Sequence, residues 1–333
     1  MRAGIRLKND SRLRGNDGRF MGEFDLIAKY FNRRPEQGIG DDCAVFTPTA
    51  GTQLCISSDM LVEGRHFFAD VNPEALGHKA LAVNLSDLAA CGATPRAFTL
   101  ALSLPEVNES WLEDFSRGLF ALADLHGCTL MGGDTTKGPL NICITVFGEV
   151  PTVNGKSGAL LRSGAQVGDD IYVSGTDVDH VGQARLALEI LRGNINATPE
   201  ELESVRHRLE SPTPRVNLGV ALRGIATSCI DVSDGLLGDL GHILKASNVG
   251  ASVQTAWIKG RVEFALAGGD DYELLLTAPP SQRDALQAIS SKASARVTCI
   301  GQVTRELGLR VLDKAGVPID QAAQAFGSFD HFA

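Results

Sequence analysis

An apolar strand passes directly into a helix within one short stretch of this chain, Ser228-Cys229-Ile230-Asp231-Val232-Ser233-Asp234-Gly235-Leu236. Residues 228–232 favour a strand, Ser-Asp-Gly favours a turn, and the apolar pattern that follows predicts a helix to about Ala246. Two carboxylates therefore flank the N-terminus of a helix, a position that attracts phosphate groups. Strands and helices alternate in the same way elsewhere, which predicts an α/β or mixed α+β architecture.

The elements expected on either side of this junction are spread over two regions. Helices are predicted at 23–31, 72–91, 111–127, 183–192, 200–210, 216–226 and 282–290, and strands at 43–46, 53–57, 141–150, 171–174 and 272–277. Residues 151–158 are rich in turn formers, so we expect a first domain at 21–150 and a second at 151–333. A chain of 333 residues is long enough for two cores.

Residues 1–20 form a basic, polar segment without an apolar stretch, so they are not a secretory signal. They are interpreted either as a solvated tail or as the product of a misassigned start, with Met21 as the true first residue. A mass spectrum of the native protein that contained peptides from this segment would exclude the second interpretation.

The composition excludes several classes of protein. The net charge is −9 and no basic stripe is present, which argues against a nucleic-acid partner. No apolar run approaches the ~18 residues of a membrane span. The seven cysteines include no C-x-x-C pair, and most have apolar neighbours, which is typical of reduced thiols in a cytoplasmic protein.

Aspartate recurs in six settings rich in glycine, serine or other small residues. These are Gly38-Ile39-Gly40-Asp41-Asp42, Ser57-Ser58-Asp59, Asn84-Leu85-Ser86-Asp87, Gly132-Gly133-Asp134-Thr135-Thr136, Asp231-Val232-Ser233-Asp234-Gly235 and Gly268-Gly269-Asp270-Asp271. Carboxylates brought together by a fold repel one another unless cations lie between them. Magnesium commonly binds through a few carboxylates plus substrate phosphates. The pattern therefore predicts magnesium-dependent phosphate chemistry.

The surroundings of these aspartates suggest how they act. Asp42 and Asp59 are expected just outside strand ends, and Asn84 and Asp87 are expected on one face of a helix. Ser57 and Ser58 offer neutral oxygens beside Asp59. The paired glycines before Asp134 can present backbone amides to a phosphate.

Known nucleotide-binding loops are absent. Asn154-Gly155-Lys156-Ser157 resembles the end of a P-loop, but the glycine required five residues before Gly155 is Val150. Gly38-x-Gly40 lacks the third glycine of the dinucleotide fingerprint. The protein-kinase motifs are also missing. If this chain handles ATP, it does so with metal ions and backbone amides.

Three further positions are open to two interpretations each. His66 is either a surface or packed histidine or a substrate contact. Arg162 is either an exposed arginine or a phosphate ligand. Phe326, Phe329 and Phe332 either seal the core or supply a ring that stacks on an aromatic substrate.

Several motifs taken together resemble the thiamine-monophosphate kinase family, which belongs to the aminoimidazole ribonucleotide synthetase-like superfamily. The resemblance runs from about residue 21 to the C-terminus and rests on Gly22-Glu23-Phe24, Gly38-Ile39-Gly40-Asp41-Asp42-Cys43-Ala44, Ala82-Val83-Asn84-Leu85-Ser86-Asp87-Leu88-Ala89-Ala90, Gly132-Gly133-Asp134-Thr135-Thr136, Ile230-Asp231-Val232-Ser233-Asp234-Gly235-Leu236 and Asp271-Tyr272-Glu273-Leu274. It implies two α/β domains, a homodimer whose first domains share a β-barrel, and transfer of the ATP γ-phosphoryl group to thiamine phosphate.

The resemblance also implies roles for individual residues. Asp42, Ser57, Ser58, Asp59, Asp87, Asp134, Asp231 and Asp234 fall on magnesium positions. Gly133, Asp134, Arg162 and Ser233 fall on ATP contacts, and His66, Asp270 and Phe329 fall on thiamine phosphate contacts. No residue is assigned as a general base, because the acceptor phosphate is already an anion near neutral pH.

This chain departs from the family pattern at three places. Asp270 stands where the family usually has glutamate, and Phe329 stands where tyrosine is common. The stretch between Gly250 and Gly268 is shorter than is usual. Other functions that suit an acidic site are a magnesium-dependent phosphohydrolase, a sister ATP-dependent synthetase and a non-catalytic ion-binding protein.

Overall fold

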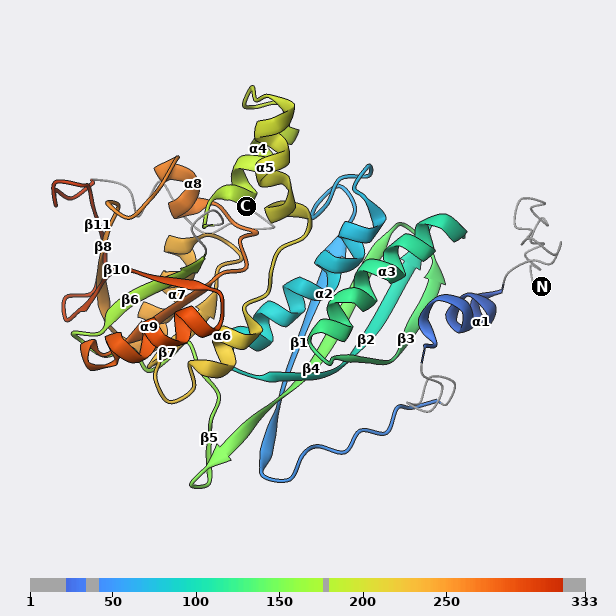
Figure 1. Ribbon diagram of the computed structural model, residues 1–333, viewed down its shortest axis with the longest axis horizontal. Helices are drawn as coiled ribbons and strands as arrows, with labels where there is room; N and C mark the ends of the chain where they lie inside the picture. The colour runs from blue at the N-terminus through green and yellow to red at the C-terminus, as the bar shows by residue number, and fades with distance from the viewer. Residues whose placement is uncertain (1–21, 34–41, 176–179, 320–333) are drawn as a thin grey trace, which may run out of the picture.

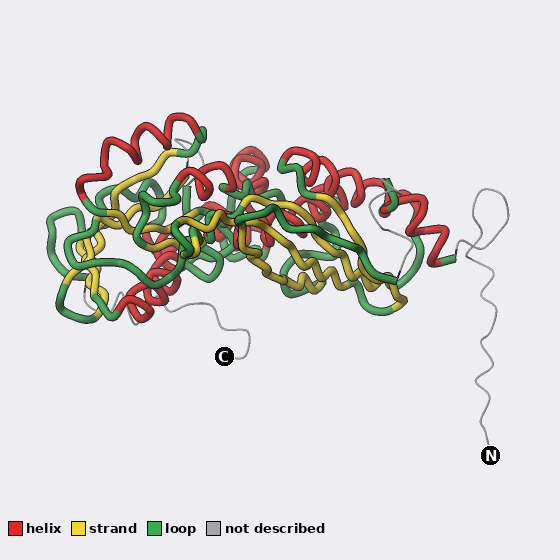
Figure 2. Tube along the Cα trace, turned by 90° about the horizontal axis from the view of Figure 1, so that it is seen from below, coloured by secondary structure: helices red, strands yellow, loops and turns green. Residues whose placement is uncertain are grey.

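The computed structural model describes residues 22–33, 42–175 and 180–319. These residues form two halves that lie side by side, each built on a mixed β-sheet (Figure 1). In Figure 2, helices of both halves run along one side of the elongated molecule. Among the described residues, no helix combines the length and the apolar character that a membrane span requires.

Helices and strands alternate in both halves, as the sequence predicts. The helices are α1 (Glu23–Leu26), continued by a π-helical turn (Ile27–Phe31), α2 (Pro73–Ala90), α3 (Glu109–Leu125), α4 (Gln183–Leu191), α5 (Pro199–Glu210), α6 (Val216–Ala221), α7 (Leu236–Ser247), α8 (Val262–Ala267), a 3-10 turn (Pro280–Gln282) and α9 (Arg283–Lys292). The strands are β1 (Thr52–Val62), β2 (Thr94–Leu104), β3 (Thr129–Lys137), β4 (Asn141–Val153), β5 (Lys156–Ser157), β6 (Asp170–Gly175), β7 (Ser228–Asp231), β8 (Gly250–Gln254), β9 (Leu274–Ala278), β10 (Arg296–Thr304) and β11 (Gly308–Leu312).

The first sheet has the order β1-β4-β2-β3, with β5 paired to the end of β4. Its pairs are antiparallel except β2 with β3, and α2 and α3 cover one of its faces (Figure 1). The second sheet has the order β11-β8-β10-β6-β9-β7, in which only β11 and β8 are parallel. Strands β1 and β3 are therefore the two edges of the first sheet.

Helix α2 is the central helix of the molecule and is buried on most of its circumference. Glycines allow its neighbours to approach closely: a Cβ on Gly118 of α3 would lie 1.9 Å from the Glu74 carbonyl oxygen, and one on Gly219 of α6 would lie 2.0 Å from the Ala89 carbonyl oxygen. Most of its buried residues are apolar, as expected for a helix covered on several sides, but Lys79, Asn84 and Ser86 are buried polar exceptions. Helix α2 therefore links the first half to the second.

Some of the predicted elements differ from the structure. Residues 43–46 form no strand, and the strand predicted at 53–57 extends from Thr52 to Val62, so that Asp59 lies inside a strand and not beyond its end. The sequence patterns predict neither strands β2, β3, β5, β8, β10 and β11 nor helix α8. Strand β3 contains Gly132, Gly133 and Asp134, residues with low strand propensity, and it is held by its pairing with β2.

Candidate active site

Strand β1 and helix α2 place matching polar side chains opposite one another. The Ser57 hydroxyl donates to the Asp87 carboxylate, and the Asp59 backbone N–H donates to Asn84 Oδ1 over 3.1 Å. Alternate residues of a strand share a face, and residues three or four apart on a helix do so too. The sequence spacing thus explains why Ser57 and Asp59 meet Asp87 and Asn84, and it confirms the expected grouping of Asn84 with Asp87.

The junction between β7 and α7 adds carboxylates from the second half. Asp231 ends β7 with a side chain that is almost fully buried, and its Oδ2 accepts the Ser86 hydroxyl of α2 over 2.7 Å. The backbone N–H groups of Ser233, Asp234 and Gly235 all donate to Asp239 Oδ2 over 3.1–3.2 Å. Contrary to the expectation for this helix N-terminus, these amides already donate to an acceptor within the chain and do not point to a phosphate.

The loop before β9 runs beside this junction in a strained conformation. Asp270 and Tyr272 have φ angles of 63° and 52°, which are uncommon for residues other than glycine. The Asp270 N–H donates to the Ser233 carbonyl, and the Tyr272 N–H donates to the Val232 carbonyl, each over 2.9 Å. A Cβ on Gly269 would lie 2.4 Å from the Ser233 carbonyl oxygen, so glycine is required there. Backbone strain of this kind is concentrated at functional sites.

These elements enclose one cleft of about 330 Å³. Its lining includes seven residues predicted to bind metal, ATP or substrate: Asp59, His66, Asp87, Asp231, Ser233, Asp234 and Asp270. Ser57 reaches the cleft indirectly, through its hydrogen bond to Asp87. The cleft thus joins residues of β1 and α2 to residues of the second half.

His66 is held in the cleft wall by the turn that follows β1. Its Nδ1 accepts the Val62 backbone N–H over 3.0 Å, so the neutral imidazole carries its proton on Nε2. The structure places His66 in the lining of the cleft, and its contact with a substrate remains a prediction.

Burial and mutual repulsion raise the pKa values of the clustered carboxyls. Burial, followed by the charges of Asp87 and Asp234, raises the pKa of Asp59 to about 6. Burial, followed by the charge of Asp87, raises the pKa of Asp231 to about 8. Burial also raises the pKa of Asp87, although Ser57 and Arg162 oppose that shift. A nearby positive charge would stabilise the ionised form of these carboxyls and lower their pKa values again.

The donor chemistry of the cleft suits magnesium only in part. Within the described residues, no group of three or more His, Cys, Asp or Glu side chains is arranged to hold a metal ion by itself. The cleft nevertheless gathers five carboxylates, and four of them, from Asp59, Asp87, Asp231 and Asp234, fall on the predicted magnesium positions. Magnesium usually takes one or two carboxylates and completes its shell with water and substrate phosphates. The residues therefore fit ions that are shared with a phosphate-bearing ligand.

Other predicted site residues lie outside the cleft. Ser58 is on the opposite face of β1, where its hydroxyl is 3.0 Å from Thr145 Oγ1. Asp42 is exposed in the segment before β1, and Arg162 is exposed in the segment before β6. Phe329 lies outside the described residues. The positive charge of Arg162 nevertheless acts to lower the pKa of Asp87, so this arginine contributes to the electrostatics of the carboxylate cluster.

Asp134 and Gly133 are on β3, three strand positions away from Asp59. The pairing runs from Asp59 to Ile144, from Ile144 to Leu100 and from Leu100 to Gly133. With about 4.8 Å between neighbouring strands, this is a separation of about 14 Å. A Cβ on Gly133 would lie 1.8 Å from the Leu100 carbonyl oxygen, so this glycine is needed for strand packing.

The cleft also contains residues that the sequence did not single out. Arg65, Arg185 and Arg192 line it, and so does Tyr272. Lys79 lies just behind it, in contact with Asp270. Arg185 and Arg192 are seven residues apart, the first in α4 and the second at its C-terminal end, so they share a helix face. This spacing is the feature of the sequence from which the pair could have been identified.

Comparison with known proteins agrees with this fold. The family model "AIR synthase related protein, N-terminal domain" matches residues 40–150, and "AIR synthase related protein, C-terminal domain" matches residues 166–314. The chain is 43% identical to the thiamine-monophosphate kinase of Escherichia coli (strain K12) over 331 residues, which cover 94% of this chain and 98% of that protein.

Solved structures give the same result. A thiamine-monophosphate kinase from Stenotrophomonas maltophilia K279a is 44% identical, with a TM-score of 0.76 over 88% of this chain and 95% of its own. AaThiL complexed with AMPPCP and TMP is 29% identical, with a TM-score of 0.71 over 94% of this chain and 97% of its own. With its two mixed sheets and its order of motifs, the chain belongs to the thiamine-monophosphate kinase family of AIR synthase related proteins.

Proposed function

We propose that this protein transfers the γ-phosphoryl group of ATP to thiamine phosphate and releases thiamine diphosphate and ADP. The observation that carries the proposal is the cleft itself, which joins four carboxylates to His66 and Asp270, the predicted acceptor contacts. Family membership and the complex of AaThiL with AMPPCP and TMP support the same assignment. We expect the enzyme in the cytoplasm, where ATP is available.

The reaction requires one P–O bond to form and one to break. An oxygen of the acceptor phosphate attacks the γ-phosphorus in line, and the bond to the β-phosphate oxygen breaks as ADP leaves. The acceptor is already anionic, so no side chain has to remove a proton. The chain's task is to align two anions and offset their repulsion. Arg65, Arg185 and Arg192 line the same cleft and contribute positive charge.

Asp59, Asp87, Asp231 and Asp234 are the residues placed to hold magnesium together with the substrate phosphates. When bound, magnesium supplies charge neutralisation of the phosphate oxygens. Ser57 fixes the orientation of Asp87, and Ser86 fixes that of Asp231, so each carboxylate is held by a neighbouring hydroxyl. Chelation with EDTA is therefore expected to stop turnover, and added Mg²⁺ to restore it.

The test is an assay of ATP consumption with and without thiamine phosphate, with thiamine diphosphate, ADP and free phosphate measured separately. The proposed kinase forms thiamine diphosphate and ADP in equal amounts, and only when thiamine phosphate and Mg²⁺ are both present. Unphosphorylated thiamine, which lacks the attacking phosphate group, is the matched control and yields no thiamine diphosphate. Free phosphate released without an acceptor would indicate a phosphohydrolase, and magnesium binding without ATP consumption an ion-binding protein. ATP consumption that depends on some other acceptor would indicate a sister synthetase.

The separation of Asp134 from Asp59 favours a homodimer in which two first domains, each spanning residues 21–150, share a β-barrel. Among the residues that the structure describes, β1 and β3 are unpaired edges, and Leu54, Ile56 and Met60 are 41%, 60% and 52% exposed along one face of β1. Closing two such sheets into a barrel removes the unpaired edges and buries the apolar face. Pairing of β3 from one copy with β1 of the other would bring Asp134 to the carboxylate cluster of the other copy.

Mixing two inactive variants tests this arrangement. Asp59→Asn and Asp134→Asn are each expected to lose activity, but a dimer of one copy of each contains one site with both carboxylates. Co-refolded or co-expressed variants are thus expected to recover activity, up to about a quarter of the wild-type value for random pairing in which half the dimers have one intact site of two. No recovery in verified mixed dimers would mean that Asp134 serves its own chain.

A further inference from the structure

Lys79 is a buried cation that lies behind the cleft. Its side chain is 3% exposed, within the first half of α2. Lysine is almost never fully buried unless it is paired. Its Nζ lies 3.2 Å from Asp270 Oδ1 and donates to the His66 carbonyl oxygen over 3.3 Å.

The two partners of Lys79 come from different halves of the molecule. His66 belongs to the turn that follows β1, whereas Asp270 belongs to the loop before β9 in the second half. A small cavity of about 50 Å³ beside the cleft is lined by Lys79, His66 and Asp270 together. The ammonium group therefore ties together two segments that face the same ligand space.

The carboxylate of Asp270 is fixed on one side only. Its Oδ1 accepts from Lys79 and also from the Tyr272 hydroxyl, over 3.1 Å. Within the described residues, both of these bonds reach Oδ1, which leaves Oδ2 for a donor on the ligand. The side chain is 33% exposed, and Asp270 lines the cleft.

We propose that Lys79 is a positioning residue for the thiamine phosphate site: it holds Asp270 and the His66 turn in one arrangement and so sets affinity for the acceptor without touching it. This inference rests on the proposed kinase function. The aspartate is one methylene shorter than the glutamate usual in the family, so its reach depends on where its backbone and Oδ1 are anchored. A charge-assisted bond to a buried ammonium supplies that anchor.

The test is steady-state kinetics of Lys79→Met, which keeps the length of the side chain and removes the charge. The KM for thiamine phosphate is expected to rise about tenfold or more, as is usual when a hydrogen bond to a charged group is lost. The KM for ATP and kcat are expected to change by no more than about threefold, because Lys79 does not line the carboxylate end of the cleft. Lys79→Arg, which retains a charge, is expected to recover part of the affinity.

Two further variants separate positioning from general stability. Arg117→Met removes an exposed ion pair between α3 and Glu74 of α2, with Nη2 and Oε2 2.8 Å apart, and is expected to leave both KM values unchanged. Adding Lys79→Met to Asp270→Asn is expected to raise the KM for thiamine phosphate by less than about threefold beyond Asp270→Asn alone, since coupled residues are not additive. The double variant removes both charges of the Lys79–Asp270 pair. Its comparison with Asp270→Asn therefore still tests the inference if Lys79→Met alone does not fold.

A Lys79→Met enzyme with a wild-type KM for thiamine phosphate would overturn the inference, as would equal increases in both KM values. Full additivity in the double variant would overturn it too. These results differ from failure of the proposed function, in which the wild-type protein itself would form no thiamine diphosphate.

Discussion

Replacing Asp87 with asparagine is expected to reduce turnover by about 100-fold or more, a loss of about 2.7 kcal/mol of transition-state stabilisation. Asp87 lies where β1, α2 and the second half meet, and its charge acts on both Asp59 and Asp231. Asparagine keeps an oxygen that can accept the Ser57 hydroxyl, but it lacks the negative charge that a shared cation requires. The measurement is kcat for thiamine diphosphate formation at saturating ATP and limiting Mg²⁺.

The fold of this variant is expected to remain intact. Without magnesium, removing the charge of Asp87 relieves repulsion on buried Asp231 and on partly buried Asp59, so the apparent melting temperature should equal or exceed that of the wild type. Asp124→Asn, at an exposed carboxylate 3.0 Å from Arg33, is the matched control and should leave kcat unchanged. Near wild-type turnover of Asp87→Asn at limiting Mg²⁺ would refute its role.

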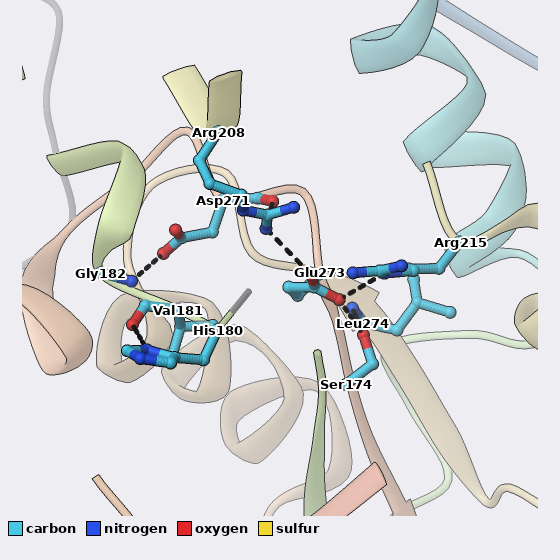
Figure 3. Close-up of polar contacts among 9 residues, drawn as sticks. All are labelled: Ser174, His180, Val181, Gly182, Arg208, Arg215, Asp271, Glu273 and Leu274. Atoms are coloured by element: carbon cyan, nitrogen blue, oxygen red, sulfur yellow. Dashed lines mark hydrogen bonds and ion pairs between the residues drawn. The ribbon is translucent and has the colours of Figure 1, made fainter. Parts of the chain in front are cut away.

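Replacing Glu273 with glutamine is expected to lower the free energy of unfolding by about 3–5 kcal/mol, the usual cost of breaking a buried ion pair. Glu273 is fully buried and accepts from Arg215 over 2.5 and 2.7 Å and from Arg208 over 2.9 Å (Figure 3). The Ser174 hydroxyl donates to the same carboxylate and also accepts the Leu274 N–H. A neutral amide would remove the carboxylate charge that pairs with both buried guanidinium groups.

The pKa of Glu273 agrees with this role. Burial alone would raise it, but Arg215 and Arg208 outweigh burial and hold the pKa below its usual value. A lowered carboxyl pKa contributes stability that is present above the unfolded-state pKa and is lost as the pH falls through the folded-state value. Unfolding of the wild type and of Glu273→Gln in urea should therefore be compared at pH 7, where Glu273 and its two arginine partners are all ionised.

Glu74→Gln is the matched control for this experiment. It makes the same chemical change at an exposed pair with Arg117, where both side chains are about half exposed. Exposed pairs contribute at most about 1 kcal/mol, so little stability should be lost. Equal losses in the two variants would show that the Glu273 network does not carry the expected energy. The network joins α5 and β9 to the segment before α6. A larger loss of unfolding free energy for Glu273→Gln than for Glu74→Gln would therefore show that this network stabilises the second half.

The sequence identified the chemical groups of the cleft better than their positions. Residue type alone predicts the same role for Ser57 and Ser58, but alternation along β1 directs Ser57 to Asp87 and Ser58 to the opposite face. The glycines before Asp134 predicted amides for a phosphate, whereas Gly133 is needed for the close approach of β3 to β2. Strand pairing is a long-range property, and residue type alone does not reveal it.

By itself the sequence determined the local junctions: a strand that ends at Asp231, a turn, a helix from Leu236, and an α2 face that carries Asn84 and Asp87. These follow from propensity and periodicity, which act over a few neighbouring residues. Only the tertiary structure decided that β3 lies far from β1, that Asp239 takes the amides of the turn, and that Lys79 meets Asp270, 191 residues away. Contacts of this kind depend on how whole elements pack and on where a buried charge finds its partner, and no local pattern encodes that pairing.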